Sequence, residues 1–310
     1  MPPKISIVIP VKNGAGTIRD CLNGIKNQTL YCETEVIVID SGSTDATLSI
    51  IGNYNVNLHQ IEPEKFNHGR TRNLGVKFAR GEFVAMTVQD AVPNDNRWLE
   101  KMLVHFEDKE VMGVCGQQIV PRKKDTNPHQ WFRPVSKPKS KIVQFHSEEF
   151  ISLSGKDQRK FCGWDDVTAM YRKSALLELP FDELIFGEDM LWAKKALIRG
   201  YKLVYEPLAR VNHYHHHSPN YTYERTMIVW LFIYLAFGFI REQPYRRSAY
   251  FLVLVRNFRW CLHPKWILHN WSIIKNVRRA VKDFNKIVSD KNVEHLELKF
   301  ALKIPQGSNK

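Results

Sequence analysis

The chain has 310 residues, of which 44% are apolar, and it carries 45 Lys and Arg residues against 32 Asp and Glu. This length allows one large domain with an extension, or two domains, and the composition excludes a disordered or low-complexity chain. The five cysteines are scattered without a Cys-x-x-Cys pair, which excludes a disulfide framework and favours reduced thiols in a cytosolic protein.

Strands and helices alternate along the first hundred residues. Short apolar runs predict strands over 5–10, 35–40, 56–61 and 83–88. Helical patterns follow each of the first three runs, over 17–27, after the turn at 41–44, and up to Ala79. This alternation predicts an α/β fold with a mostly parallel sheet, in which ligands bind at the carboxyl ends of the strands.

The α/β pattern is interrupted and then resumes. Residues 121–150 are rich in Pro and Lys and predict a long loop, which is either a mobile lid or a plain surface insertion. Beyond it, a strand is expected over 167–171, helices over 174–179 and up to Arg199, and a strand near 202–207.

The last third of the chain differs in charge. Residues 220–310 contain 16 Lys and Arg against 6 Asp and Glu, whereas the preceding 219 residues contain 29 basic and 26 acidic residues. A basic region of this kind indicates an anionic partner: a membrane surface, a nucleic acid or a phosphorylated substrate. Nucleic acid is not expected, because no recognised binding motif accompanies the charge.

The apolar stretch over 227–240 bears on the choice between these partners. It is shorter than the roughly 20 residues needed to span a bilayer, so a buried core helix is the simplest interpretation. The segments after it interleave Trp, Tyr and Phe with Arg and Lys, a mixture that suits the lipid headgroup region. Docking on a membrane surface is therefore favoured over a purely internal helical bundle.

Carboxylates stand at several predicted strand and helix ends. Asp40 closes a buried strand, where it either binds the base or sugar of a nucleotide or only caps the next turn. Asp90 follows the strand over 83–88 and is a candidate ligand for a hard cation such as Mg²⁺ or Mn²⁺. Glu188 and Asp189 begin a helix, where acidic residues either offset the helix dipole or supply a general base.

Two further motifs combine His, Arg and Gly. In "VNHYHHHS" (211–218), His213, His215 and His217 share one face of an extended chain and can bind a metal or phosphate, or form a surface cluster without a role. In "FNHGRTRN" (66–73), Arg70 and Arg72 are candidates for binding an anion at a helix entry. The alternative for this second motif is a helix entry with exposed arginines.

In their order and spacing, these motifs resemble the inverting glycosyltransferases of family 2, which have the GT-A fold. The resemblance runs from about Ile5 to Tyr221 and includes "ISIVIPVKNGAGTIRDCLNGIKNQT", "VIVIDSGSTDAT", "FVAMTVQDAVP" in the place of the D-x-D motif, and "GED" as the catalytic acidic pair. "FNHGRTRN" with "QDAVP" is most similar to bacterial rhamnosyltransferases that build surface polysaccharides. The resemblance implies a GT-A domain over 1–219 and a helical region over 220–310 for membrane-surface docking or dimerisation.

Carried over to matching positions, the resemblance implies a role for each motif. Asp189 is the expected catalytic base, with Glu188 beside it, and the acceptor site is expected at Trp164, Asp165 and Asp166. A divalent cation, Mg²⁺ or Mn²⁺, is expected at Asp90, His213 and His215; Val88 replaces the first aspartate of D-x-D, which leaves Asp90 as the carboxylate of that motif. The nucleotide-sugar site is expected to comprise Pro10, Val11, Asp40, His68, Gly69, Arg70, Arg72 and Gln89.

The resemblance implies transfer of a 6-deoxyhexose, L-rhamnose from dTDP-L-rhamnose, to a sugar hydroxyl. The expected acceptor is a glycan on a polyprenyl diphosphate carrier, in O-antigen or capsule synthesis, and the enzyme is expected in the cytoplasm, peripheral at the inner face of the cell membrane. One alternative is the same fold with UDP-galactose or UDP-N-acetylglucosamine as donor. Another is a non-catalytic, membrane-docked binder of a nucleotide sugar or glycan. The aromatic C-terminal helices can equally bury a homodimer interface.

Overall fold

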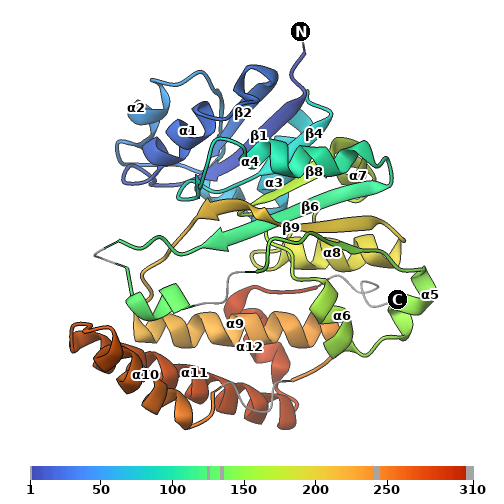
Figure 1. Ribbon diagram of the computed structural model, residues 1–310. Helices are drawn as coiled ribbons and strands as arrows, with labels where there is room; N and C mark the ends of the chain where they lie inside the picture. Colours follow the sequence, from blue (N-terminus) through green and yellow to red (C-terminus); the bar gives the residue numbers. More distant parts are fainter. Residues whose placement is uncertain (1, 124–125, 133–135, 241–244, 305–310) are drawn as a thin grey trace. The chain divides into compact units, whose positions relative to one another are not determined.

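The computed structural model describes residues 2–123, 126–132, 136–240 and 245–304 (Figure 1). The chain forms two compact units, Met1–Ile119 with Ser136–Tyr214, and Val120–Val135 with His215–Lys310. The sequence-based division falls after residue 219, whereas here the second unit begins at His215 and also takes part of the predicted loop over 121–150. Residues 124–125 and 133–135 of that loop, and residues 241–244 and 305–310 of the C-terminal region, lie outside the described residues.

The first unit is built on one mixed sheet with the strand order β3-β2-β1-β4-β8-β6-β9-β5, and β7 pairs with β9 (Figure 1). The strands are β1 (Ile5–Val11), β2 (Thr34–Asp40), β3 (Asn57–Gln60), β4 (Phe83–Met86), β5 (Val92–Pro93), β6 (Val111–Ile119), β7 (Lys141–Val143), β8 (Ala169–Arg172) and β9 (Lys202–Asn212). Strands β1 to β4 are parallel to one another, β8 is antiparallel to both β4 and β6, and β6 is parallel to β9. The predicted α/β fold with a mostly parallel sheet is therefore confirmed.

Helices cover both faces of this sheet, and the alternation of side chains along β1 shows how. Ile5, Ile7 and Ile9 are fully buried in one core cluster with α1 (Ile18–Lys26), α2 (Thr47–Ile51) and α4 (Trp98–Leu103). Val8 faces the other way, toward α3 (His68–Phe78), where a Cβ on Gly75 would lie 2.3 Å from Val8 Cγ1. Glycine at this position therefore lets α3 pack directly on β1.

The remaining helices of the first unit follow β7 and β8. They are α5 (Ser147–Ser152), α6 (Gly155–Phe161), α7 (Lys173–Glu178) and α8 (Glu188–Ile198). Short 3₁₀ helices lie at Tyr31–Glu33, Pro63–Lys65 and Val104–Glu107. β7 and the beginning of α5 fall inside the predicted loop over 121–150, so that stretch has more regular structure than its composition predicts.

The second unit is helical. It contains a 3₁₀ helix, η4 (Pro128–Phe132), and the helices α9 (Pro219–Phe237), α10 (Ser248–Arg259), α11 (Lys265–Ser289) and α12 (Val293–Phe300) (Figure 1). α9 begins where the Ser218 side chain accepts a hydrogen bond from the Tyr221 N–H, and it ends at Gly238, whose φ is 69°.

The apolar stretch over 227–240 forms the greater part of α9. Seven of its side chains are buried: Met227, Trp230, Leu231, Phe232, Ile233, Ala236 and Phe237. The simplest interpretation of this stretch, a core helix, is therefore confirmed. Within the described residues, every helix is too short or too polar to cross a membrane.

The direction of the strands decides where a site can form. β1, β2, β4, β6 and β9 all end at the same edge of the sheet, and β8 begins there because it runs the opposite way. The segments that carry Asp40, Asp90, Gln118, Asp165 and His213 are thereby brought to one edge. Polar groups at the carboxyl ends of parallel strands commonly line a ligand site in α/β proteins.

Candidate active site

Two acidic residues at the start of α8 lie at the centre of the site. Gly187 precedes the helix with a φ of 79°, a left-handed conformation that glycine adopts without steric cost. Glu188 is buried, whereas Asp189 is partly exposed. The Asp189 carboxylate accepts hydrogen bonds from the N–H groups of Met190, at 2.7 Å, and Asp166, at 3.2 Å. Two backbone N–H groups therefore hold the Asp189 carboxylate in position, while it keeps access to solvent.

Arg72 holds the buried partner of this pair. Its Nη1 donates to Glu188 Oε1 at 2.5 Å, and its Nε lies 2.9 Å from Asp166 Oδ2. Burial alone lowers the pKa of Arg72, but the charges of Glu188, Asp166 and Asp189 outweigh it and raise that pKa. The guanidinium is therefore permanently charged and neutralises Glu188 and Asp166 more directly than Asp189.

The segment before β8 adds an aromatic and carboxylate group to the site. The Tyr171 hydroxyl donates to Asp166, and Trp164 Nε1 donates to the Tyr171 oxygen at 2.6 Å. The Tyr171 and Trp192 rings pack edge to face, with centroids 4.7 Å apart. Trp164 and Asp166 are buried by these contacts, while Asp165 is partly exposed. Of the three predicted acceptor residues, Asp165 is thus the accessible one.

Crowding of carboxylates shifts their proton affinities. Desolvation and the charge of Glu188 raise the pKa of Asp189 to about 6, although Arg72 opposes the shift. Desolvation and the charge of Asp189 likewise raise the pKa of Asp165 to about 6. A carboxylate with a pKa near neutrality is ionised at pH 7 and still binds a proton well, which suits a general base.

A side chain that sequence reasoning missed connects this cluster to Asp90. Gln118, at the end of β6, donates through its amide nitrogen to Asp165 and accepts from His213 Nδ1, 2.7 Å from its amide oxygen. His213 Nε2 then lies 3.4 Å from Asp90 Oδ1. Because the Gln118 amide nitrogen donates to a carboxylate, its oxygen must be the acceptor, so the Nδ1 atom of His213 is the donor in this contact.

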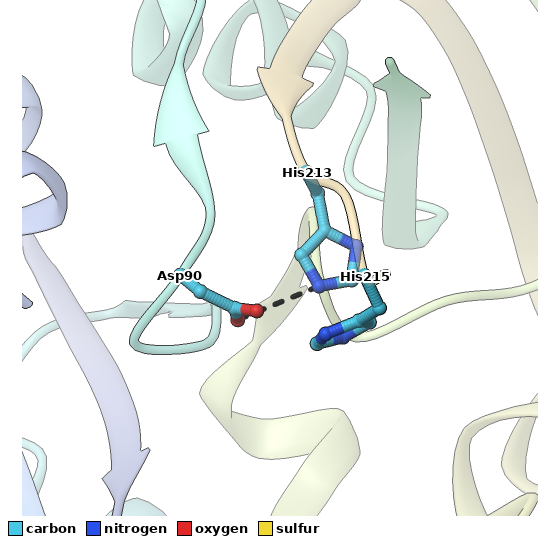
Figure 2. A group of neighbouring side chains, drawn as sticks. All are labelled: Asp90, His213 and His215. Atoms are coloured by element: carbon cyan, nitrogen blue, oxygen red, sulfur yellow. Dashed lines mark ion pairs between the residues drawn. The ribbon is translucent and has the colours of Figure 1, made fainter. Parts of the chain in front are cut away.

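Asp90 and the histidines form a candidate metal centre. One ligand atom from each of Asp90, His213 and His215 lies within 4.8 Å of the others. Figure 2 shows the Asp90 carboxylate and the His213 imidazole facing each other, with His215 following two residues later along the chain. Imidazole nitrogen together with carboxylate oxygen suits Mn²⁺ better than Mg²⁺, which prefers oxygen ligands. The three residues therefore fit the predicted cation by their chemistry.

The predicted nucleotide side of the edge is ordered by local hydrogen bonds. Asp40, fully buried, accepts from the N–H groups of Gly42 and Ser43, each at 3.1 Å, and from the Ser43 hydroxyl at 2.5 Å. Val11 pairs with Asp40 in the β1–β2 register, next to Pro10. The Asp40 carboxylate thus closes the turn after β2, and its contact with a base or ribose stays a prediction.

Gln89 is held in a similar way. Its amide oxygen accepts from the Lys12 N–H at 2.8 Å, and its amide nitrogen donates to the Lys12 carbonyl at 3.0 Å. A Cβ on Gly14 would lie 2.6 Å from the Gln89 amide oxygen. Gln89 therefore ties the loop after β4 to the loop after β1, and its contact with the donor sugar also stays a prediction.

The "FNHGRTRN" motif spans the beginning of α3: Phe66 and Asn67 precede the helix, and the other six residues form its first turns. Asn67 is the cap, and its side-chain oxygen accepts from the Arg70 N–H at 3.1 Å. Arg70 is exposed and pairs with Glu183 at 2.5 Å. His68 lies 3.4 Å from Arg72 Nη1 through its Nδ1. Both arginines of the motif therefore contact carboxylates here, and their predicted contact with a nucleotide diphosphate stays untested.

Close packing explains why a glycine stands at position 69. A Cβ at this position would lie 1.8 Å from the Asp182 carbonyl oxygen, and the Gly69 N–H donates to the Leu184 carbonyl at 3.4 Å. The loop before α8 thus approaches the backbone of α3 closely at Gly69. This approach holds α3, with Arg72, against the loop that leads to Glu188.

Comparison with known proteins finds a family model and relatives that match this chain. The family model described as glycosyl transferase family 2 matches residues 6–178. The O-antigen chain rhamnosyltransferase RfbN of Salmonella typhimurium is 31% identical over 229 residues, which cover 72% of this chain and 70% of that protein. WbaN of Salmonella anatum, another O-antigen chain rhamnosyltransferase, is 33% identical over 234 residues with the same coverage.

Solved structures share the fold at low sequence identity. A mannosyltransferase from Pyrobaculum calidifontis, in complex with GDP-Man and Mn²⁺, superposes with a TM-score of 0.56 at 16% identity, covering 94% of this chain and 88% of its own. Staphylococcus aureus TarS, residues 1–349, gives a TM-score of 0.54 at 19% identity, covering 98% and 97%. These likenesses support the predicted GT-A fold.

Proposed function

Since the chain belongs to glycosyl transferase family 2, we propose that it transfers L-rhamnose from dTDP-L-rhamnose to a sugar hydroxyl of a lipid-linked glycan, with inversion. The observation that carries the reaction is Asp189, a partly exposed carboxylate with a pKa raised to about 6. The choice of rhamnose rests on the similarity to the two O-antigen rhamnosyltransferases.

The proposed reaction is a single displacement. The acceptor hydroxyl oxygen forms a bond to the anomeric carbon while the bond from that carbon to the diphosphate oxygen breaks, and the nucleotide diphosphate leaves with the electron pair. Asp189 takes the hydroxyl proton. Glu188 stays paired with Arg72, so it positions the helix start and does not compete for that proton. No covalent intermediate is needed.

The donor and the cation are proposed to bind on the His213 side of Gln118, opposite Asp165. Asp90, His213 and His215 would hold Mn²⁺ or Mg²⁺, which when bound neutralises charge on the leaving diphosphate. Pro10, Val11, Asp40 and Gln89 would line the base and sugar, with His68, Gly69, Arg70 and Arg72 on the α3 side. Gln118 donates a hydrogen bond to Asp165 and accepts one from His213, and these two contacts support a connection between the leaving-group and acceptor ends.

The acceptor and the location of the enzyme are part of the same proposal. Asp165 is proposed to bind an acceptor hydroxyl, with Trp164 and Asp166 shaping the site behind it. The acceptor is proposed to be a polyprenyl-diphosphate-linked glycan of O-antigen or capsule synthesis, so the enzyme would act in the cytoplasm, peripherally at the inner face of the cell membrane. Nucleic acid has no part in it, and a homodimer stays an open expectation.

A donor panel tests this function. Purified protein is mixed with a short-lipid diphosphate glycan and one of dTDP-L-rhamnose, UDP-galactose or UDP-N-acetylglucosamine, with Mn²⁺ present. Transfer from dTDP-L-rhamnose at least about tenfold faster than from the others, with inverted anomeric configuration by NMR, is the expected result. Faster transfer from a UDP-sugar would replace rhamnose by that sugar. Tight donor binding without product, even with several acceptors, would favour a non-catalytic binder.

A further inference from the structure

Helix α10 presents bulky apolar side chains to solvent. Phe251, Val255 and Phe258 recur with the i, i+4, i+7 spacing of one helix face, and Leu252 lies beside them. Phe251 is 68% exposed and Phe258 is 78% exposed, so these rings are not even half covered by the rest of the chain. A cluster of this kind on a surface helix commonly marks an interaction site.

The inner face of α10 explains why the apolar face points outward. Val253 and Asn257 are buried on that side. The Asn257 side-chain oxygen lies 2.6 Å from His129 Nε2, and its amide nitrogen reaches the carbonyls of Leu262 and His263 at 3.4 and 3.3 Å. Turning the helix to bury the two phenylalanines would break these contacts. The exposure is therefore fixed by the packing of the second unit.

The charged residues of the segment that contains this face have one sign. Residues 245–282 contain nine Lys and Arg and no Asp or Glu. Arg246 and Arg247 immediately precede α10 and Arg259 ends it, and all three are exposed. Trp260, also exposed, follows directly. Exposed aromatic and aliphatic side chains flanked by arginines are the features of helices that lie in the headgroup region of an anionic membrane.

We propose that the outer face of α10 (Phe251, Leu252, Val255 and Phe258), together with Arg246, Arg247 and Arg259, is a docking surface for anionic lipid headgroups. The helix lies in the plane of the bilayer surface, with its apolar face at the acyl boundary and its arginines at the phosphates. This surface deepens the proposed function, because it names the part of the chain that brings the enzyme to a lipid-linked acceptor.

Two other partners fit this surface less well. A second copy of the chain would bring an equal density of positive charge against it, which opposes association. A nucleic acid would neutralise the arginines and stack bases on Phe251 and Phe258, but it would leave the aliphatic side chains of Leu252 and Val255 without an apolar partner. An anionic lipid surface satisfies both the charge and the apolar side chains.

Vesicle flotation of the full chain tests the proposal. One set of vesicles is phosphatidylcholine alone, and the other contains about one-third phosphatidylglycerol, a proportion that gives a strongly negative surface. The variants are Phe251→Gln/Phe258→Gln and Arg246→Gln/Arg247→Gln. The matched control is Leu177→Gln, because Leu177 is a 60% exposed apolar residue on α7 in the first unit. Thermal melts show whether each variant folds as the parent chain does.

The parent chain and Leu177→Gln should float with the anionic vesicles. With the neutral vesicles, both should stay in the bottom fraction of the gradient. The phenylalanine variant should bind at least about tenfold more weakly, and the arginine variant about tenfold more weakly with a smaller salt dependence. Equal binding of all variants would overturn the proposal. So would absence of vesicle binding by the parent chain, or loss of a dimer in sedimentation as the sole effect of the phenylalanine variant.

A rate measurement separates this inference from the function itself. With a water-soluble glycan acceptor, both α10 variants should keep the transfer rate of the parent chain. With an acceptor embedded in anionic vesicles, their rates should fall in parallel with binding. Failure of transfer in the parent chain with every donor would refute the proposed function, whereas the vesicle result would still stand on its own.

Discussion

The acidic limb of the pH–rate profile is the sharpest test of the site. Asp189 must be ionised to accept a proton, and its pKa is raised to about 6. With that pKa, about nine-tenths of the molecules hold the ionised base at pH 7 and about one-tenth at pH 5. The rate constant kcat/KM should therefore fall about tenfold between pH 7 and pH 5. A flat profile over this range would refute the role of Asp189 as an ionisable base.

Substitutions next to Asp189 should shift the acidic limb of the pH–rate profile in a direction set by the charge that they remove. The charge of Glu188 is the largest electrostatic contribution that raises the pKa of Asp189, whereas Arg72 lowers it. Glu188→Gln removes a negative charge and should therefore move the limb to lower pH. A shift of the limb to higher pH in this variant would contradict the arrangement of charges described above.

Asp165 is the necessary control, because desolvation and the charge of Asp189 raise its pKa to about 6 as well. If Asp189 is the base, Asp165→Asn should weaken acceptor binding and keep an acidic limb, whereas Asp189→Asn should lower the rate about 10²- to 10⁴-fold. The assay is initial rate against pH at fixed Mn²⁺ with saturating donor. Loss of the limb in Asp165→Asn, with activity kept in Asp189→Asn, would exchange the two roles.

Three further predictions concern stability and the metal centre. Asp189→Asn should raise the Tm at pH 7 and much less at pH 4, as measured by calorimetry at both pH values. The pKa of Asp189 is raised in the folded protein, so the protein loses stability as the pH rises through about 6 and this carboxyl ionises, and the asparagine removes that loss. Gln118→Leu should weaken Mn²⁺ binding about 10- to 100-fold by electron paramagnetic resonance titration, because it removes the acceptor that fixes the His213 tautomer; unchanged affinity would show that the contact is incidental. Gly69→Ala should lower the free energy of unfolding in urea by about 2 kcal/mol or more, because its methyl group meets backbone, whereas Gly16→Ala, with open space around its Cβ, should change it little.

Local sequence patterns were sufficient for the strands that are buried on both faces. β1, β2 and β4 are short apolar runs bounded by polar turns, and the structure has them within a few residues of the predicted ranges. The position of the polar motifs at the strand ends then follows from the parallel direction of these strands. Glu188 and Asp189 could also be assigned to a helix start from the sequence alone, because acidic residues favour the first turn of a helix.

β6 was not predicted, and Gln118 was missed with it. Its sequence contains Gly113 and Gly116, which weaken the pattern of a strand. Gly116 is there because the backbone of β9 approaches closely: a Cβ would lie 2.2 Å from the Ala209 carbonyl oxygen. The pairing with β9 also shifts register between Cys115 and Gln117, and this irregularity decides where Gln118 points. Neither the close approach nor the shift is visible in a single strand's sequence.

Arg72 shows why the charge balance of the site needed the structure. In the sequence it stands beside Arg70 and suggests an anion-binding pair, but its partner Glu188 is 116 residues away. That contact, with Asp166 as the second, divides the carboxylates into two kinds. Asp166 and Glu188 are buried and paired with the guanidinium, whereas Asp165 and Asp189 are partly exposed. Desolvation raises the pKa of all four carboxylates. The first pair holds together α3, the segment before β8, and α8, so the second pair is available for the proposed binding and deprotonation of an acceptor.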